Sequence, residues 1–242
     1  MTQDTITLIQ RLRNMTKQPQ SRGDATRQAL ILAAITIFGR DGFHAASTRD
    51  IAREAEANQA AIGYHFGGKE ALYLAAIRDI AGQITTRIGP ITEEIRAKLD
   101  ELVEQHVDPV KIREESLSLL IKLMSGMLRM LVTRESSSWA RLILREQQSP
   151  TPAFDVFYKE LMSRIMQVTT ELVGRIRGLD PQLEEAKILA ITVFGQVIVF
   201  RASREAVLRY MGWEDFSEDE IETLQTQIRL NITAMLTHGE SQ

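Results

Sequence analysis

Three amphipathic segments follow one another closely between residues 24 and 66, and this spacing restricts the folds open to the chain. The first segment covers about 24–40, and two short ones cover about 47–55 and 58–66. Only Glu56-Ala57 separates the two short segments. A tight turn between two short helices, behind a longer first helix, is the layout of a helix-turn-helix.

Local signals support each of these boundaries. The apolar residues of the first segment share one helical stripe, made of Leu30, Ile31, Ala34, Ile37 and Phe38. Asp41-Gly42 ends this helix, and Ser47-x-x-Asp50 resembles a capping box that starts the second. Asn58 is a suitable N-cap for the third helix, and Gly67-Gly68 breaks it before Lys69 opens a fourth. We therefore expect three packed helices of well-defined length.

The rest of the chain also favours helices. Helix formers predominate, only 6 prolines occur in 242 residues, and the β-branched and glycine punctuation of sheet proteins is missing. The remaining predicted helices are 69–88, 91–106, 110–133, 136–147, 153–177, 181–211 and 217–238. The predicted fold class is all-α, with an N-terminal three-helix helix-turn-helix domain and a C-terminal helical bundle.

Composition restricts the protein class further. The chain has no cysteine, which excludes disulfides and thiol chemistry, and its formal net charge of −3 is unlike that of a non-specific nucleic-acid coat. The charge divides unevenly, with +2 over residues 1–80 and −5 over residues 81–242. The longest apolar run, 188–200, is too short to cross a bilayer, and no signal peptide is evident. We expect a soluble cytoplasmic protein without a membrane partner.

Several residues near the short helices are poor choices for stability alone. Arg49 and Lys69 lie in first turns of helices, where the helix dipole disfavours cations, but a phosphate bound between them and the helix amides would explain both. Gly63 costs roughly 1 kcal/mol against alanine inside a helix. Close approach of its backbone to DNA or to a neighbouring helix would justify it. A single such cation is usually a surface residue, and Tyr64-His65 alone is more often packing, so it is their convergence that indicates function.

Residues 25–75 resemble the DNA-binding domain of the TetR family of transcriptional regulators (TetR/AcrR type). The resemblance depends on three stretches: Phe38-Gly-Arg-Asp-Gly-Phe43, Ser47-Thr-Arg-Asp-Ile-Ala52 and Ile62-Gly-Tyr-His-Phe-Gly-Gly-Lys-Glu-Ala-Leu72. Two positions depart from the family pattern. Glu56 replaces the usual turn glycine, so a non-glycine residue there must adopt a left-handed conformation unless the turn differs. Gly63 replaces a common aromatic residue.

The resemblance implies a role for each matching residue. Ser47, Thr48 and Arg49 would contact phosphates, and Asn58, Gln59 and Ala60 would face base edges in the major groove. Tyr64 and His65 would contact the phosphate backbone, Gly63 would lie close to it, and Lys69 would bind another phosphate. Gln59 is the best candidate for direct readout, because its amide can pair with adenine N6 and N7.

The implied organisation has three parts. Residues 1–24 would form a flexible basic arm, 25–80 the TetR-type DNA-binding domain with its motif at about 47–66, and 81–242 a helical domain for ligand binding and dimerisation. Part of the last region resembles the CecR-like subgroup. That similarity involves Leu144-Arg-Glu-Gln-Gln-Ser-Pro-Thr-Pro-Ala-Phe154, Phe194-Gly-Gln196 and Leu208-Arg-Tyr-Met-Gly-Trp213.

Methionines and aromatic residues in the C-terminal region are candidates for an adaptable ligand pocket. These candidates are Met124, Met127, Met130, Trp139, Phe157, Met162 and Met166. Each is also compatible with ordinary core packing. Arg141, Arg145 and Glu146 would supply polar anchors or form surface pairs. The predicted helix 110–133 is apolar on two faces and should lie at the centre of the bundle.

A paired molecule is required because one short helix reads too few base pairs. A narrow apolar stripe on the last helix is our candidate dimerisation surface, formed by Ile221, Leu224, Ile228, Ile232 and Met235. The run 188–200 is apolar nearly all round, as expected if one face meets its own domain and another a partner subunit.

The sequence argues against an enzyme. None of the histidines His44, His65, His106 and His238 has metal-ligand spacing, and no nucleophile-elbow, P-loop or dinucleotide motif occurs. Adjacent acids such as Glu93-Glu94 diverge on a helix and cannot form a dyad. A helical interaction module that has lost DNA binding is a second alternative, against which the intact Tyr64, His65 and Lys69 cluster argues.

The prediction is therefore a ligand-responsive transcriptional regulator that binds a palindromic operator in double-stranded DNA as a homodimer. A small-molecule effector of unknown identity would release it, and no cofactor or metal is expected. Repression rather than activation is implied by the resemblance alone. The translation start, Met1 or Met15, stays open.

Overall fold

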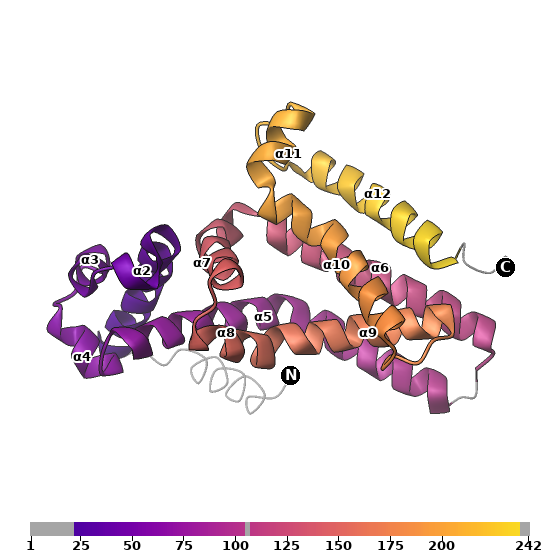
Figure 1. Ribbon diagram of the computed structural model, residues 1–242, viewed down its shortest axis with the longest axis horizontal. Coiled ribbons are helices and arrows are strands. Elements are labelled where there is room, and N and C mark those ends of the chain that lie inside the picture. The colour runs from indigo at the N-terminus through magenta and orange to yellow at the C-terminus, as the bar shows by residue number, and fades with distance from the viewer. Residues whose placement is uncertain (1–21, 105–106, 238–242) are drawn as a thin grey trace, which may run out of the picture. The chain divides into compact units, whose positions relative to one another are not determined.

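The computed structural model describes residues 22–104 and 107–237 (Figure 1). The predicted arm, 1–24, lies almost wholly outside these ranges. The described residues form helices and no strand, which confirms the all-α fold class. They divide after Tyr73 into two compact units, and the predicted boundary at residue 80 lies in the same helix, α5.

The first unit consists of α2 (Arg22–Ala45), α3 (Thr48–Glu54), α4 (Ala60–Phe66) and the start of α5 (Lys69–Glu104). All five residues of the predicted stripe on α2 are buried, as are Ile51 and Ile62. Tyr73 packs edge-on against Phe38, with the ring centroids 4.8 Å apart, and against Phe43 at 4.9 Å. Gly42 breaks α2 with a left-handed φ of 80°, as the sequence indicates, and a last turn follows to Ala45.

The second unit contains most of α5 and all later helices. These are α6 (Pro109–Val132), the 3₁₀ turn η1 (Arg134–Ser136), α7 (Ser137–Gln148), α8 (Pro152–Phe157), the π-helical η2 (Tyr158–Met162), α9 (Ser163–Arg177), α10 (Glu184–Ala202), α11 (Arg204–Met211) and α12 (Glu218–Thr237). Helix α6 packs against α9, α10 and α12 and buries ten of its residues, including Leu120, Met124 and Leu128. The prediction that this helix is central is confirmed.

Two predicted helix boundaries are wrong, and each has a physical reason. Pro90 does not end α5. It lacks the N–H that would pair with the Thr86 carbonyl, but both residues are exposed, so water can replace that hydrogen bond. Ile88 and Ile95, before and after Pro90, are buried and anchor the helix on both sides of this point. The predicted helix 181–211 is instead two helices, α10 and α11, bent by 79° at Ser203.

Tight local interactions explain two of the motifs in this unit. The Glu146 carboxylate is buried and accepts hydrogen bonds from the backbone N–H and hydroxyl of Thr151, both at 3.1 Å. Thr151 in turn caps α8, whose first residue is Pro152. At the start of α12, Ser217 and Glu220 form the predicted capping box, in which the Ser217 N–H donates to the Glu220 carboxylate at 2.8 Å.

Candidate DNA interface and a groove in the second unit

Backbone caps hold α3 and α4 in a compact helix-turn-helix. The Ser47 hydroxyl accepts a hydrogen bond from the Arg49 N–H at 3.2 Å and caps α3, whereas Asp50 pairs with Arg53. The turn depends on Glu56, whose φ of 51° is left-handed, as its departure from the family pattern predicts. Asn58 then accepts from the Ala60 N–H at 2.8 Å and starts α4. The two short helices are thus fixed by side chains within 14 residues of one another.

Most of the predicted DNA-contacting residues are available to solvent. Six are exposed, namely Arg49, Asn58, Gln59, Ala60, Gly63 and Tyr64. Four are half-buried, namely Ser47, Thr48, His65 and Lys69. Tyr64 is 86% exposed, an unusual cost for a large aromatic residue. The Gln59 amide donates to the Thr48 hydroxyl at 3.2 Å, so the first turns of α3 and α4 lie together. This surface is polar and faces solvent, and its six exposed residues do not pack in the core.

Lys69 has a structural partner in addition to its predicted role. Its ammonium donates to the His44 carbonyl at 3.1 Å and lies 5.0 Å from the centre of the Phe43 ring. These contacts hold the charge beside the end of α2, and an ammonium has further N–H donors. The ammonium is therefore fixed in place and keeps donors for a further partner.

Gly63 has no packing partner in the described chain. A methyl group added at its Cα would meet no atom within 4 Å. The idea that a neighbouring helix requires this glycine is therefore wrong for the described residues.

Arg27 belongs to the same region but was missed by the sequence analysis. It is exposed on α2, and its guanidinium lies 5.2 Å from the centre of the Phe66 ring at the end of α4. No local motif connects these two residues, because they meet only through the packing of α2 against α4.

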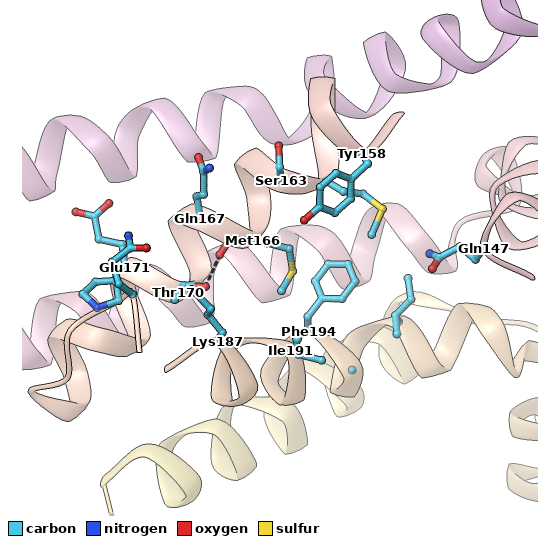
Figure 2. A pocket seen from close by; sticks show the side chains of 15 residues that line it. Gln147, Tyr158, Ser163, Met166, Gln167, Thr170, Glu171, Lys187, Ile191 and Phe194 are labelled. Atoms are coloured by element: carbon cyan, nitrogen blue, oxygen red, sulfur yellow. Dashed lines mark hydrogen bonds between the residues drawn. The ribbon is translucent and has the colours of Figure 1, made fainter. Parts of the chain in front are cut away.

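The second unit contains a groove of about 860 Å³ between α9 and α10 (Figure 2). Its middle is apolar, with Met166 and Phe194 facing each other and Tyr158 beside them. Polar side chains gather at one end, which Figure 2 shows as Gln167, Thr170, Glu171 and Lys187. The Thr170 hydroxyl donates to the Met166 carbonyl at 2.7 Å, and Glu171 accepts from Arg175 at 3.0 Å. Thr170 therefore keeps acceptor capacity, and Lys187 is the cation of the groove lining.

The seven predicted ligand residues separate into two groups. Met162 and Met166 line the groove. The other five are at most 6% exposed and lie in the core, outside the groove lining; they are Met124, Met127, Met130, Trp139 and Phe157. The remaining groove residues were missed because Thr170, Lys187 and Ile191 carry no pattern that separates a groove wall from a surface.

The predicted dimerisation stripe on α12 lies against its own chain. Ile221, Leu224, Ile228 and Ile232 are buried, and Met235 is half-buried. This helix packs on α6, α9 and α10, so the four buried side chains are not available to a partner and their assignment is corrected. An apolar stripe has the same spacing whether a neighbouring helix belongs to the same chain or another. Helix α10 instead exposes large apolar residues, with Ile188 at 56%, Ile191 at 60% and Val199 at 42%.

Residues 22–104 and 107–237 contain neither a metal-binding cluster nor a single membrane-spanning helix. No group of three or more histidine, aspartate or glutamate side chains is arranged to hold a metal ion there. No single helix in those ranges is long and apolar enough to cross a bilayer; α10 and α11 meet that requirement only when the bent pair is counted together.

A compact helix-turn-helix whose second helix presents exposed polar residues and an exposed tyrosine defines a DNA-binding transcriptional regulator. Comparisons with known proteins agree. Residues 30–76 match the bacterial regulatory proteins of the tetR family, and residues 113–238 match the C-terminal domain of the HTH-type transcriptional dual regulator CecR. The chain belongs to the TetR family and carries a CecR-type C-terminal domain.

Individual relatives support this assignment over nearly the whole chain. The HTH-type transcriptional dual regulator CecR of Shigella flexneri is 30% identical over 215 residues, which cover 89% of this chain and 93% of that protein. A TetR-family regulator from Mesorhizobium loti MAFF303099 has a similar fold, with a TM-score of 0.58 at 19% identity over 89% of this chain and 98% of that one. AibR, solved with isovaleryl coenzyme A and operator DNA, has a TM-score of 0.56 at 16% identity over 87% and 97%.

Proposed function

We propose that this regulator represses transcription by binding a palindromic operator as a homodimer, and that a small molecule in the α9–α10 groove releases it. The exposed polar surface of α3 and α4 carries this proposal. Arg49, Tyr64, His65 and Lys69 would bind phosphates and fix the register, while Gln59 and Asn58 would read base edges. Arg27 adds a cation beside Phe66.

Two copies are required by the size of the reading element, because α4 has only seven residues. The outward face of α10 is the surface we assign to the partner. Its exposed Ile188 and Val199 lie outside the groove lining and are about three helical turns apart on one face, and such a face is costly in water unless another surface covers it. The opposite face of α10 is buried in its own unit, which agrees with the expectation that this run is apolar on both sides.

The α9–α10 groove suits an effector with an apolar body and a polar or anionic end. Its volume lies in the range of small-molecule pockets, roughly 300–1,000 Å³. Met162 and Met166 can repack around different shapes, and Lys187 offers a charge at the polar end. AibR, which shares the fold, binds isovaleryl coenzyme A, a molecule with a short acyl group and anionic phosphates.

A link from the groove to α5 would couple ligand and DNA. Tyr158 and Met162 of the π-helical η2 line the groove, while Glu160 of the same segment pairs with Arg78 of α5 at 3.5 Å. Helix α5 begins at Lys69, in the DNA-binding unit. π-Helical turns are rare and often mark functional sites, and a change in this segment would be the trigger. The effector would act by favouring a dimer geometry that does not fit the operator.

Selection of duplexes from a random pool by the purified protein tests this proposal. We expect an enriched inverted repeat whose half-sites are separated by about one or two helical turns. Ile188→Glu, on the outward face of α10 and outside the groove lining, should give a monomer that loses the repeat, whereas the control Glu205→Gln on α11 should keep it. Enrichment of no motif would overturn the proposal, and dimers that survive Ile188→Glu unchanged would overturn its dimer face.

A further inference from the structure

Two neighbouring amide side chains at the start of α4 are engaged in different ways. The Asn58 side-chain oxygen accepts from the Ala60 N–H at 2.8 Å and caps the helix, so the part of this amide that stays free is mainly its NH₂ group. The Gln59 side chain forms no cap, and its Nε2 donates to the Thr48 hydroxyl at 3.2 Å. Within residues 22–104 and 107–237, Gln59 Oε1 has no hydrogen-bond partner. Gln59 therefore keeps one N–H and its carbonyl oxygen for a ligand.

These two sets of free groups fit different base edges. A free N–H beside a free carbonyl oxygen matches adenine, which presents the N7 acceptor next to the N6 amino group in the major groove. A donor alone, which is what Asn58 mainly retains, finds an acceptor on every base pair and so discriminates little. Of the two amides, only that of Gln59 is left with the pair of groups that selects one base.

Thr48 holds the Gln59 amide in this state. It is the first residue of α3, so the hydrogen bond crosses from one short helix to the other. The bond lies at the surface and adds little to the fold, because Glu56 and Asn58 already fix the turn. Its main effect falls on Gln59, an exposed long side chain that would otherwise sample many rotamers. A hydroxyl that accepts a hydrogen bond also keeps its own O–H, so Thr48 can donate to a phosphate at the same time.

On the basis of the DNA-binding function proposed above, we propose that Thr48 determines specificity by positioning Gln59 to read one adenine in each half-site. Gln59 donates one N–H to adenine N7 and accepts from the N6 amino group, while its other N–H keeps the bond to Thr48. The Thr48 hydroxyl donates to a backbone phosphate and so links the register of the protein on the duplex to the reading of that base. Asn58 acts chiefly as the cap of α4.

The affinities of the full chain for duplexes that differ at one base pair of one half-site test this assignment. The base pair is identified first, as the position of the selected operator at which Gln59→Ala loses its preference. The wild type should prefer adenine there by on the order of 10- to 100-fold. Gln59→Glu should prefer cytosine, because a carboxylate only accepts and cytosine presents its N4 amino group. Thr48→Val, which removes the hydroxyl and keeps the branched shape, should reduce the adenine preference about 2- to 10-fold at this position alone.

Two further variants separate positioning from a general loss of binding. Thr48→Ser keeps the hydroxyl and should keep the adenine preference. Thr36→Val is the matched control on α2, because the exposed Thr36 hydroxyl donates to the Leu32 carbonyl of its own helix at 3.2 Å, and it should behave like the wild type.

The possible failures are distinguishable. A Thr48→Val protein that keeps the full adenine preference, or that loses the same affinity for all four bases, would overturn the role of Thr48. A selected motif without adenine at the position read by Gln59 would overturn the base assignment. Absence of any motif would overturn the DNA-binding function itself, and this assignment with it.

Discussion

The two units of this regulator use exposed side chains in different ways. In the first unit, Arg49, Asn58 and Tyr64 project into solvent, while Phe38, Ile51 and Ile62 hold the fold. In the second unit one helix does several tasks, since α10 buries Val193 and Val197, lines a groove with Phe194 and exposes Ile188. Function and stability are therefore separable in the first unit and shared in the second. The predictions below sharpen this contrast.

The largest effect should come from removing two exposed contacts of the first unit together. Arg49→Ala combined with Tyr64→Ala should weaken operator binding at least about 100-fold, because two phosphate contacts are lost. The melting temperature should stay unchanged, since neither side chain packs in the core. Fluorescence anisotropy with a selected operator and a thermal melt measure the two quantities.

Tyr210→Ala is the matched control for this variant. Tyr210 is 91% exposed on α11, so it is as accessible as Tyr64 but lies in the second unit. Its replacement should change neither operator affinity nor stability. A comparable loss of affinity in Tyr210→Ala would show that exposed tyrosines in general, and not this surface, support binding.

Replacing Asp215, in the second unit, should change stability and leave operator affinity unchanged, the reverse of the Arg49 and Tyr64 variant. Burial alone would raise the pKa of the Asp215 carboxyl, but hydrogen bonds from Arg134, the Phe216 N–H and Arg204 lower it from 3.8 to about 2. The lowered pKa stabilises the fold above pH 4, and this contribution disappears as the pH falls through about 2. Asp215→Asn should therefore lower the free energy of unfolding by about 2 kcal/mol near neutral pH. Operator affinity, measured where the variant is fully folded, should be unchanged.

Urea unfolding of wild type and Asp215→Asn across this pH range checks the prediction. The difference in the free energy of unfolding should narrow on acidification. A gap that stays constant down to pH 2 would mean that the carboxylate charge is not what stabilises the turn between α11 and α12.

Gly63 is the position where both properties should change in opposite directions. Gly63→Ala should raise stability by roughly 1 kcal/mol, because alanine favours the helix and the added methyl meets no atom within 4 Å. It should also reduce operator affinity about 10-fold if the α4 backbone approaches DNA closely. Stabilisation without any loss of affinity would remove the functional reason for this glycine.

The smallest effect should arise at the turn. Glu56 holds a left-handed φ of 51°, which costs a non-glycine residue about 1 kcal/mol. Glu56→Gly should therefore stabilise the protein by up to that amount and leave operator affinity within about twofold, as measured by melting and anisotropy. A destabilised variant would show that contacts of the Glu56 side chain stabilise the fold by more than its left-handed backbone destabilises it.

The same contrast between the two units explains how much of the structure could be predicted from sequence alone. The geometry of the proposed DNA-binding surface was predictable because its caps and turn lie between Ser47 and Lys69, where local rules decide the geometry. The groove and the partner face were not, because Met124 and Met166 look alike in sequence, and only the packing of α6, α9 and α10 makes one core and the other groove. Pro90 led to a wrong boundary for a related reason, since the burial of Ile88 and Ile95 and the exposure of Pro90, which allow the helix to continue, are not visible in the local sequence.

The central claim is that the surface from Ser47 to Lys69 binds DNA specifically. Its most direct test is the affinity of the purified full chain for a selected duplex against bulk competitor DNA, in moderate salt and without effector. Our account predicts a preference of roughly 10³-fold or more, together with a steep fall in affinity as salt rises, by about 0.9 log units per log unit of salt for each phosphate contacted. Equal affinity for every duplex would contradict it.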